Sequence, residues 1–536
     1  MSQLELAKAW VAQDPDPNTR AELQALIDQA QTEQLSDRFA QLLQFGTAGL
    51  RGELGAGPNR MNRIVVSYAA LAIARFLVSH KSTYADSSGE LKVVIGYDGR
   101  ENSDVFALDS AEILQASGCQ ALLFDRAVPT PVAAFTGKTL GAAATIVVTA
   151  SHNPPRDNGY KVYLGGPNGC SQLISPQDKE IAHLIEQISK SETFSSIEHS
   201  SDFQSLGQSE IDSYVARAAS LVEKISSDRA NLKITHTSLH GVGWSVVEKL
   251  FGETGFQVSP VPQQMNPDSS FPTVSFPNPE ESGAMDLAYS FASQSACDLI
   301  LANDPDADRL AVAVPEGDGW RMLTGDQVGL ILADYIASKN NQGTIANSIV
   351  SASLENLAKS FNLKYEQTLT GFKWISKVPN LIYGYEEALG YCVDPAHTPD
   401  KDGITAALLI AEIAATLKAK GSNLAEHLEN LNAKFGQIST GQVSIRVSDL
   451  SIIGKIMQHV RTSPPAEFDG PLSMTDLSNS EKLKTDAVLI ENQSARMIFR
   501  PSGTEPKLKC YLQFKGDEAG LARLKEFATS YLAAAQ

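Results

Sequence analysis

Short apolar runs and longer amphipathic runs alternate along the first 200 residues of the chain. Short apolar runs predict strands, and runs in which apolar residues recur every three or four positions predict helices. The expected elements are a helix over 66–78, a strand over 92–97, a helix over 103–117, and strands over 121–124 and 143–148. Strands alternating with helices in this way predict an α/β sheet domain.

The residues before this domain carry a helical pattern of their own. Thr19 is followed three residues later by Glu22, which matches a capping box and predicts that a helix begins at Thr19. Apolar residues then recur at helical spacing at Leu23, Leu26 and Ile27. We therefore expect a helical extension over 19–44, ahead of the first domain.

The alternation resumes after a polar, serine-rich stretch from Ser189 to Ser209, which we interpret as a linker. Beyond it the pattern predicts a strand over 232–237, a helix over 245–251 and a strand over 299–301. At about 100–200 residues per domain, the chain is long enough for several domains. We expect four domains, over residues 1–200, 201–318, 319–438 and 439–536.

Composition and charge narrow the class of protein. Hydrophobic residues make up 43% of the 536, enough for several buried cores. The formal net charge of -18 argues against nucleic acid or an anionic membrane as a partner, because either would need an extended basic surface. The five scattered cysteines fit a reduced, cytoplasmic protein. We see no secretory signal and no apolar run of the ~18 residues that a membrane span needs, so we expect a soluble protein.

A hydroxyl stands on a constrained turn directly after the strand expected at 143–148. The turn reads Thr149-Ala150-Ser151-His152-Asn153-Pro154-Pro155, and a second turn is expected at 157–159 before a strand at 160–163. Prolines restrict the backbone, and α/β sheets place their chemistry at strand ends. Ser151 is therefore a candidate nucleophile or phosphate carrier.

Two other roles for this turn are a purely structural one and that of a serine hydrolase. Ser and Asn often close turns with side chain to backbone hydrogen bonds, and this segment alone does not separate that role from a chemical one. A serine hydrolase is disfavoured, because its nucleophile elbow has glycine where this chain has Thr149 and Asn153. His152 does not fit a triad base either, since such a base usually meets its serine through the fold.

Three carboxylates occupy alternate positions after the strand at 299–301. Alternation can point Asp304, Asp306 and Asp308 the same way, which would make an oxygen-ligand site for a hard divalent cation. An EF-hand loop is excluded, because Arg309 and Pro315 stand where it needs Gly and Glu. The remaining alternative is a solvated acidic turn. Because a strand at 310–314 would hold three like charges together, we favour a metal, with Mg²⁺ as the best candidate.

Cations at strand ends are candidate anion ligands. Arg500-Pro501-Ser502-Gly503-Thr504 follows an apolar strand, and a guanidinium beside two hydroxyls and a glycine can cradle a phosphate. Arg51 and Arg100 are further cations at such junctions. Singly, each is more often a surface residue or an ion-pair partner.

A pair of glutamates stands on a loop bounded by glycines, Gly384-Tyr385-Glu386-Glu387-Ala388-Leu389-Gly390. Adjacent carboxylates can accept hydrogen bonds from vicinal sugar hydroxyls. A glycosidase that uses paired carboxylates is the competing enzyme, and buried loop packing is the other alternative. Upstream, Lys373 and Trp374 add a cation and an aromatic ring.

In this order, these segments resemble the α-D-phosphohexomutase superfamily, in particular its phosphoglucomutase and phosphomannomutase branch with an N-terminal helical extension. The resemblance runs from about residue 40 to the C-terminus. It rests on Phe45-Gly46-Thr47-Ala48-Gly49-Leu50-Arg51-Gly52, Thr149 to Pro154, Asp304 to Arg309, Gly384 to Ala388 and Arg500 to Pro506. It implies an α/β fold with four domains around a central cleft: three related mixed α/β sheet domains and a smaller C-terminal α+β domain.

The resemblance also implies roles for particular residues. Ser151 would carry a phosphoryl group and, with Asp304, Asp306 and Asp308, bind Mg²⁺. His152, Lys161 and Lys373 would line the cleft, where any of them could assist proton transfer. The remaining substrate-binding residues would be Arg51, Arg100, Arg309, Glu386, Arg500, Ser502, Gly503 and Thr504. Many relatives have Ser where this chain has Ala388, which leaves the preferred sugar open.

The expected function is a phosphosugar mutase that interconverts glucose 1-phosphate and glucose 6-phosphate. It would work through phosphoserine and a glucose 1,6-bisphosphate intermediate, which would also serve as activator. The alternatives that use the same residues are a phosphomannomutase, a phosphopentomutase and a sugar-bisphosphate synthase. A phosphosugar-binding protein without activity would be expected to lose Ser151 or an aspartate. The sequence leaves the oligomeric state open, with a monomer favoured.

Overall fold

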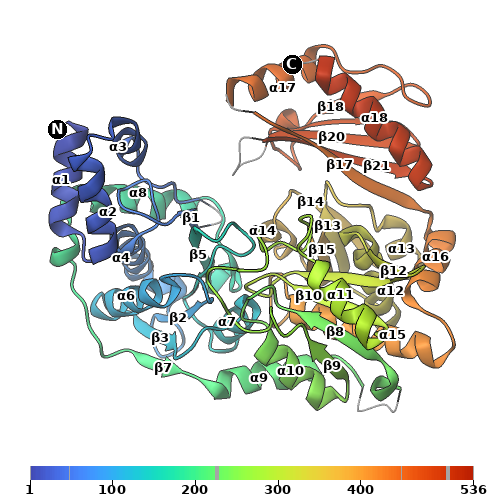
Figure 1. The fold of residues 1–536 in the computed structure, drawn as a ribbon, viewed down its shortest axis with the longest axis horizontal. Coiled ribbons are helices and arrows are strands. Elements are labelled where there is room, and N and C mark those ends of the chain that lie inside the picture. The colour runs from blue at the N-terminus through green and yellow to red at the C-terminus, as the bar shows by residue number, and fades with distance from the viewer. Residues whose placement is uncertain (1, 47–48, 224–227, 448–449, 502–506, 535–536) are drawn as a thin grey trace. The chain divides into compact units, whose positions relative to one another are not determined.

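The computed structural model describes residues 2–46, 49–223, 228–447, 450–501 and 507–534 (Figure 1). The chain divides into two compact units, which we describe separately: a first unit of residues 1–322 and 390–419, and a second unit of residues 323–389 and 420–536. By its contacts the segment 390–419 lies in the first unit. The reason is that its buried helix α15 (Gly403–Ala419) packs against strands of that unit.

Helices α1 (Gln3–Gln13), α2 (Pro17–Asp28) and α3 (Thr32–Phe39) form the N-terminal extension. The predicted start at Thr19 is wrong. Helix α2 begins at Pro17, and the Asp16 carboxylate caps it by accepting a hydrogen bond from the Asn18 N–H at 2.8 Å. Proline suits the first position of a helix, where its missing N–H is not needed. The Thr19 hydroxyl donates instead to Asp14 Oδ2, at 2.7 Å.

The first sheet has the strand order β1-β5-β4-β2-β3-β7, with β6 on β5. Strand β5 is antiparallel to its neighbours, whereas the adjacent strands β4, β2, β3 and β7 are parallel to one another, so the sheet is mixed. The strands predicted at 92–97, 121–124 and 143–148 are confirmed as β2, β3 and β4. The bounds are β1 (Leu50–Glu53), β2 (Lys92–Tyr97), β3 (Gln120–Phe124), β4 (Ala144–Val148), β5 (Asp157–Leu164), β6 (Ser171–Gln172) and β7 (Gln204–Leu206).

Two expectations for this region are wrong. The turn expected at 157–159 is the start of β5, because β1 pairs with it there and places Arg51 opposite Gly159. The stretch expected to be a linker contains the end of a helix and also β7, which extends the first sheet by pairing with β3. In both places pairing with a distant strand overrides a local sequence that is rich in turn-forming residues.

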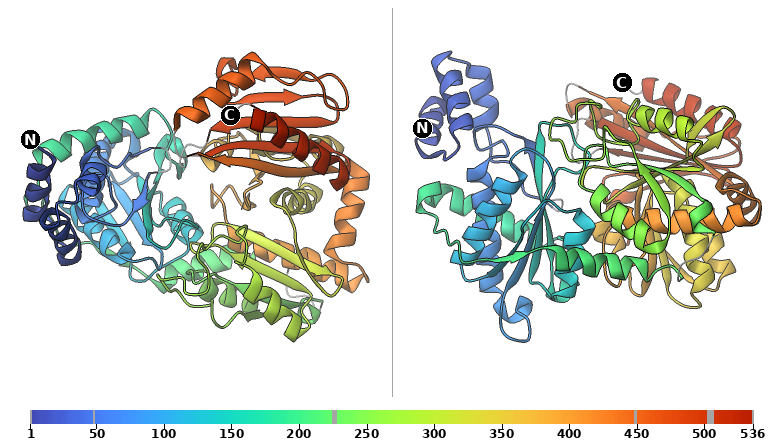
Figure 2. Two further views of the ribbon diagram at one scale, coloured as in Figure 1. Left: turned by 45° about the horizontal axis from the view of Figure 1, so that its top comes forward. Right: turned by 60° about the horizontal axis from the view of Figure 1, so that its bottom comes forward.

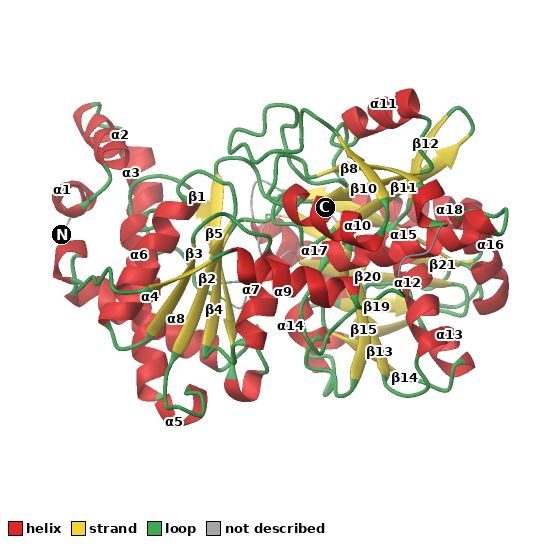
Figure 3. Ribbon diagram, turned by 90° about the horizontal axis from the view of Figure 1, so that it is seen from below, coloured by secondary structure: helices red, strands yellow, loops and turns green. Residues whose placement is uncertain are grey.

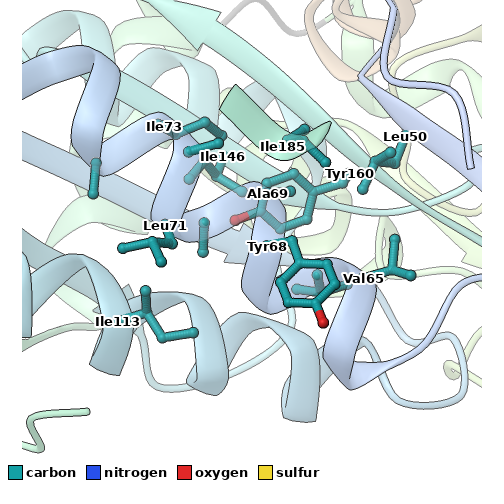
Figure 4. Packing of buried hydrophobic residues seen from close by; sticks show 14 of the residues in the cluster. Leu50, Val65, Tyr68, Ala69, Leu71, Ile73, Ile113, Ile146, Tyr160 and Ile185 are labelled. Carbon is teal, nitrogen blue, oxygen red and sulfur yellow. The ribbon is translucent and has the colours of Figure 1, made fainter. Parts of the chain in front are cut away.

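Helices α4, α6 and α8 cover one face of this sheet and α7 covers the other (Figure 3). Figure 4 shows how α4 fills the core, with Val65, Tyr68 and Ala69 near Ile146 of β4 and Tyr160 of β5. The predicted helices over 66–78 and 103–117 are confirmed. The bounds are α4 (Arg63–Ser79), α5 (Lys81–Tyr84), α6 (Ser103–Ala116), α7 (Thr130–Thr139) and α8 (Gln177–Ser191).

The second sheet of the first unit has the order β12-β11-β10-β8-β9 and is also mixed, since β10 pairs parallel with β8 and antiparallel with β11. The strands predicted at 232–237 and 299–301 and the helix at 245–251 are confirmed. The strand bounds are β8 (Lys233–Thr237), β9 (Gln257–Pro260), β10 (Leu299–Asn303), β11 (Leu310–Glu316) and β12 (Gly319–Met322). Strand β16 (Gly390–Cys392), in the later segment, is not a strand of this sheet. The helices are α9 (Gln208–Ala219), α10 (Trp244–Thr254), α11 (Asp286–Ser295) and α15.

The second unit begins with a parallel sheet in the order β14-β13-β15. Its strands are β13 (Thr344–Ser348), β14 (Lys364–Thr368) and β15 (Leu381–Glu386). Its helices are α12 (Gly325–Lys339), α13 (Glu355–Ser360), α14 (Phe372–Ile375) and α16 (Leu424–Phe435).

The C-terminal part of the second unit is an antiparallel sheet in the order β17-β21-β20-β19-β18. Helices α17 (Leu450–Thr462) and α18 (Glu518–Ala534) pack on it, and Figure 2 shows α17 in orange and α18 in dark red beside its strands. Alternation along β20 sends Met497 and Phe499 into the core under these helices and Ile498 toward Ile349 and Val350. The strands are β17 (Ile438–Arg446), β18 (Ser473–Asp476), β19 (Val488–Glu491), β20 (Ala495–Pro501) and β21 (Lys507–Lys515).

These sheets confirm the predicted fold class, with three α/β sheets and a smaller C-terminal domain built on an antiparallel sheet. Within the described residues, no helix is both long and apolar enough to cross a membrane.

Candidate active site

Ser151 lies on the loop that follows β4, in a left-handed backbone conformation with a φ of 52°. Its N–H donates to Thr149 Oγ1 at 2.8 Å, and its side chain is only 3% exposed. The hydroxyl donates to Asp304 Oδ2 at 2.8 Å, and His152 Nδ1 lies 3.3 Å from the same Oγ. A non-glycine residue in this conformation carries strain, which is typical of functional loops. The loop therefore presents the hydroxyl of Ser151 to the aspartate loop.

The side chain of Arg100 holds in place the loop that carries Ser151, which we call the serine loop. Its Nη2 donates to the carbonyls of Ser151 and Asn153, at 2.6 and 2.7 Å, and its Nη1 donates to those of Pro154 and Asp157, at 2.9 and 3.0 Å. We had expected Arg100 to bind substrate. These four contacts with backbone carbonyls fix the loop, and substrate binding by Arg100 stays a prediction.

The three aspartates come together as the sequence predicted. Asp304, Asp306 and Asp308 are fully buried at the end of β10, and each offers a carboxylate oxygen within 4.8 Å of the others. Thr130 Oγ1 donates to Asp306 Oδ2 at 2.6 Å. The loop that follows β8 packs its backbone against the aspartate loop, since a Cβ added at Gly241 would lie 2.3 Å from the Cα of Pro305.

Lys161 neutralises part of this charge. Its Nζ lies 2.6 Å from Asp306 Oδ2 and 2.7 Å from Asp308 Oδ2. Burial and the two neighbouring carboxylates raise the pKa of Asp304 well above its usual range. Burial alone would also raise the pKa of Asp308, but Lys161, Lys401 and Arg309 hold it below its usual range. The cluster therefore lacks enough positive charge to ionise all three carboxyl groups easily.

The aspartates fit a divalent cation. Among the described residues, Asp306 Oδ1 and Asp308 Oδ1 are buried oxygens without a hydrogen-bond partner. Buried polar atoms are normally paired, and carboxylate oxygens are the ligands that hard cations prefer. Lys161 engages the other oxygen of each carboxylate, which is how outer-shell partners commonly orient metal ligands. The three aspartates are thus suited to hold a metal such as Mg²⁺.

A cavity of about 120 Å³ opens in front of Ser151 and Asp308. Lys161 and the predicted residues Arg51 and Arg309 line it, and Arg51 Nη1 also donates to Asn153 Oδ1 at 3.2 Å. Burial, followed by the nearby Arg309 and Arg51, lowers the pKa of His152 well below its usual value, which leaves the ring neutral at pH 7. The first unit thus gathers a hydroxyl, a neutral imidazole and several cations at one place.

Lys401 also lines this cavity and was missed in the sequence. Its Nζ lies 3.3 Å from Asp308 Oδ2, and its side chain is largely buried. A lysine between Asp400 and Asp402, just ahead of a long apolar helix, was the available signal. That signal did not reveal the contact with Asp308, because Asp308 is distant in the chain.

The second unit gathers predicted sugar and phosphate ligands. Glu386, at the end of β15, accepts a hydrogen bond from the Gly371 N–H at 2.6 Å. Lys373, Trp374 and Arg500 line one cavity of about 210 Å³. Ser502, Gly503 and Thr504, like Thr47 and Ala48, lie outside the described residues.

Glu387, the second glutamate of the pair, is tied to Ser351. The Ser351 hydroxyl donates to Glu387 Oε2 at 2.7 Å and accepts from the Glu387 N–H at 3.0 Å. Desolvation of the partly buried carboxyl group, followed by repulsion from Glu386, raises the pKa of Glu387 from 4.5 to about 8. At pH 7 Glu387 is therefore mostly protonated, and Glu386 does not face a second full negative charge.

This raised pKa predicts a pH-dependent stability. Between pH 4.5 and about pH 8 the folded protein keeps a proton on Glu387 that the unfolded chain has lost. The contribution of Glu387 to the free energy of unfolding should therefore be fully present below pH 4.5 and be lost as the pH rises toward 8. Glu387→Gln should remove this loss and stabilise the second unit by roughly 1–2 kcal/mol at pH 8, after allowing for partial exposure.

The measurement is the midpoint of thermal unfolding of both proteins between pH 5 and pH 8. The same substitution at the exposed Glu429 is the control and should leave the profile unchanged. A Glu387→Gln profile parallel to that of the unmodified protein would contradict the raised pKa.

Comparison with known sequences gives the family. The sequence signatures of phosphoglucomutase/phosphomannomutase α/β/α domains I, II and III match residues 42–192, 212–317 and 324–435, and the signature of the C-terminal domain matches 457–529. The chain therefore belongs to the phosphoglucomutase/phosphomannomutase family of the α-D-phosphohexomutase superfamily. It is an enzyme of the phosphohexomutase type.

Individual relatives agree with this assignment. The chain is 44% identical to a protein of Haemophilus influenzae named "Probable phosphomannomutase", over 85% of this chain and 94% of that one. It is 35% identical to a "Probable phosphoribomutase" of Schizosaccharomyces pombe, over 96% and 94% of the two chains. The crystal structure of a phosphoglucomutase/phosphomannomutase family protein from Burkholderia thailandensis shares the fold, with a TM-score of 0.70, 20% identity, and coverage of 92% of this chain and 97% of that one.

Proposed function

We propose that the protein is a phosphosugar mutase in which Ser151 carries the transferred phosphoryl group, and that it interconverts glucose 1-phosphate and glucose 6-phosphate. The observation that carries the proposal is the 2.8 Å hydrogen bond from the Ser151 hydroxyl to Asp304, at the edge of a buried carboxylate cluster suited to a divalent cation. A phosphoryl group on Ser151 would lie beside that cation.

The charges around Ser151 support phosphoryl transfer. The cations Lys161, Lys401 and Arg309 do not fully offset the three buried carboxylates, since the pKa of Asp304 stays raised, so a dianionic phosphate beside them needs a further divalent cation to balance it. Mg²⁺ bound there would neutralise charge on the transferring group, and the side chains supply the remaining cations. In the first transfer the bond between phosphorus and Ser151 Oγ breaks and a bond to a sugar hydroxyl oxygen forms. In the second transfer the other phosphate of the bisphosphate leaves its sugar oxygen and forms a bond to Ser151 Oγ.

The first transfer also removes a proton from the attacking sugar hydroxyl, and the second removes one from the Ser151 hydroxyl and returns it to the sugar oxygen that the phosphate leaves. His152 is a candidate acceptor, because its imidazole is held neutral within 3.3 Å of Ser151 Oγ. Lys161 is engaged by two carboxylates and is better placed to hold the aspartates. On this account Ser151 must already be phosphorylated before turnover, and glucose 1,6-bisphosphate would restore a lost phosphate.

The predicted contacts for the rest of the substrate come from the second unit. Glu386 would accept hydrogen bonds from sugar hydroxyls, and Lys373 would lie near them. Arg500 with Ser502, Gly503 and Thr504 would bind the phosphate that is not being transferred. A bisphosphate intermediate that turns over would present its two phosphates in turn to Ser151.

A pentose phosphate is the second candidate substrate. Ala388 lacks the hydroxyl that many relatives place after the glutamate pair, and the relative from Schizosaccharomyces pombe is named for ribose phosphate. A mutase for mannose phosphates, as in the name of the Haemophilus influenzae relative, would use the same residues.

The test is a comparison of kcat/KM for the 1-phosphates of glucose, mannose, glucosamine and ribose, with a catalytic amount of glucose 1,6-bisphosphate and Mg²⁺. We expect the highest value for glucose 1-phosphate, by about tenfold or more, since one hydroxyl matched to a site is worth at least that factor. A higher value for ribose 1-phosphate would replace the glucose assignment, and no turnover of any of them would refute the mutase.

A further inference from the structure

Three consecutive side chains between β16 and α15 point to three different partners within the first unit. Lys401 reaches Asp308 and lines the cavity in front of Ser151. Asp400 contacts residues of the first sheet, and Asp402 contacts α9. Lysine has a long, flexible side chain, so the direction in which Lys401 points depends on the contacts that hold its backbone and the neighbouring carboxylate of Asp400.

The Asp400 carboxylate is fully buried and well satisfied. Its Oδ2 accepts hydrogen bonds from Tyr163 Oη and Gln172 Nε2, both at 2.7 Å. Tyr163 on β5 and Gln172 on β6 are directly opposite each other across the two strands. A cross-strand pair with both donors on one oxygen gives that oxygen a defined position.

The other oxygen of Asp400 faces Lys401. Oδ1 accepts a hydrogen bond from the Lys401 N–H at 2.8 Å and lies 3.4 Å from its Nζ. Tyr163 also stands two residues after Lys161, so both side chains project from the same face of β5. One strand thus positions the ammonium of Lys161 at 2.7 Å from Asp308 and, through Asp400, the ammonium of Lys401 at 3.3 Å from the same oxygen.

We propose that Asp400, Tyr163 and Gln172 form a cradle that aims the Lys401 ammonium into the Ser151 cavity. They are positioning residues, and Lys401 is the group that would meet the transferred phosphate. The inference rests on the proposed function. Because a misplacement of about 1 Å near the chemistry can lower a rate by about 100-fold, loosening the cradle should slow turnover without unfolding the protein.

The chain contains a matched control for this cradle. Tyr214 on α9 is as deeply buried as Tyr163 and donates to both oxygens of Asp402, at 2.8 and 2.9 Å. Asp402 also accepts hydrogen bonds from the N–H groups of Ile404 and Thr405 at the start of α15. The Tyr214 contact therefore secures the helix rather than the lysine.

The experiment compares Tyr163→Phe with Tyr214→Phe. Each removes one hydroxyl from a buried pair of the same kind, so both should lower the melting temperature by similar amounts. Tyr163→Phe should lower kcat by about 10–100-fold with KM changed less than twofold, whereas Tyr214→Phe should leave kcat within twofold. Equal loss of kcat in the two variants would overturn the proposal. If Tyr163→Phe does not fold, Gln172→Leu removes the other donor and carries the same expectation.

A double-mutant cycle shows whether the effect passes through Lys401. In a Lys401→Met background, Tyr163→Phe should lower kcat no further, since the side chain that it aims is gone. A second loss as large as in the unmodified protein would show that Tyr163 acts on something else.

Crystal structures separate this proposal from the proposed function. In Tyr163→Phe the Lys401 ammonium should move away from Asp308, and in Tyr214→Phe it should stay. An unmodified protein without mutase activity would refute the function, while that movement would still support the cradle. An active protein whose Lys401 stays in place in Tyr163→Phe would refute the cradle alone.

Discussion

Ser151→Ala is expected to lower the mutase kcat by at least about 10⁴-fold, the scale seen when a covalent nucleophile is removed. The hydroxyl is the acceptor and donor of the phosphoryl group, so no other residue can replace it by a small movement. Folding should change little, because the side chain is small and its loop is held through backbone contacts with Arg100 and Thr149.

Ser110→Ala is the matched control for this change. Ser110 is a fully buried serine of α6 that accepts a hydrogen bond from Tyr160 Oη at 2.8 Å. Its loss should cost stability of about 1 kcal/mol and leave turnover intact. The measurement is the steady-state rate with glucose 1,6-bisphosphate and Mg²⁺ present. Turnover by Ser151→Ala within tenfold of the unmodified protein would mean that another group carries the phosphate.

Lys161→Met is expected to lower the free energy of unfolding by about 3–5 kcal/mol in metal-free buffer, the usual effect of breaking a buried ion pair from one side. Methionine keeps the length of the side chain but leaves Asp306 and Asp308 without their shared ammonium. The loss should shrink when Mg²⁺ is added, because a cation bound to the same carboxylates offsets their repulsion and favours the folded state.

The measurement is urea unfolding of the purified protein with EDTA and with excess Mg²⁺. Lys190→Met serves as control, since Lys190 makes an exposed ion pair with Glu186 on α8 and should contribute less than about 1 kcal/mol with or without metal. If Lys161→Met were equally destabilised in both buffers, the aspartates would not be the site of the cation.

Much of the fold followed from local sequence patterns. Apolar runs such as 92–97 and 143–148 became buried strands, because a strand in the middle of a sheet must be apolar on both faces. Patterns failed where a distant partner decided the structure. Residues 157–159 look like a turn but extend β5 because β1 pairs with them, and 204–206 form a strand because β3 offers a free edge.

The candidate site also contains residues that short sequence motifs predicted and residues whose roles depend on distant partners. Ser151 and the three aspartates were found because each stands in a short motif beside a strand, and the structure brings them together. The role of Arg100 in holding the serine loop was missed, because its sequence context shows a cation at a strand end but not the four carbonyls that it contacts. Lys401 was missed because its contact with Asp308 and its place beside the Ser151 cavity arise only when segments distant in the chain pack together.

The central claim is that Ser151 carries the phosphate, and mass spectrometry of the intact protein and of its peptides tests it most directly. After incubation with glucose 1,6-bisphosphate and Mg²⁺, one phosphate should appear on the peptide that contains Ser151, and glucose 1-phosphate should then remove it and yield bisphosphate. A protein that turns over substrate while this peptide stays unmodified, or a Ser151→Ala variant that acquires the same exchangeable phosphate, would contradict the account.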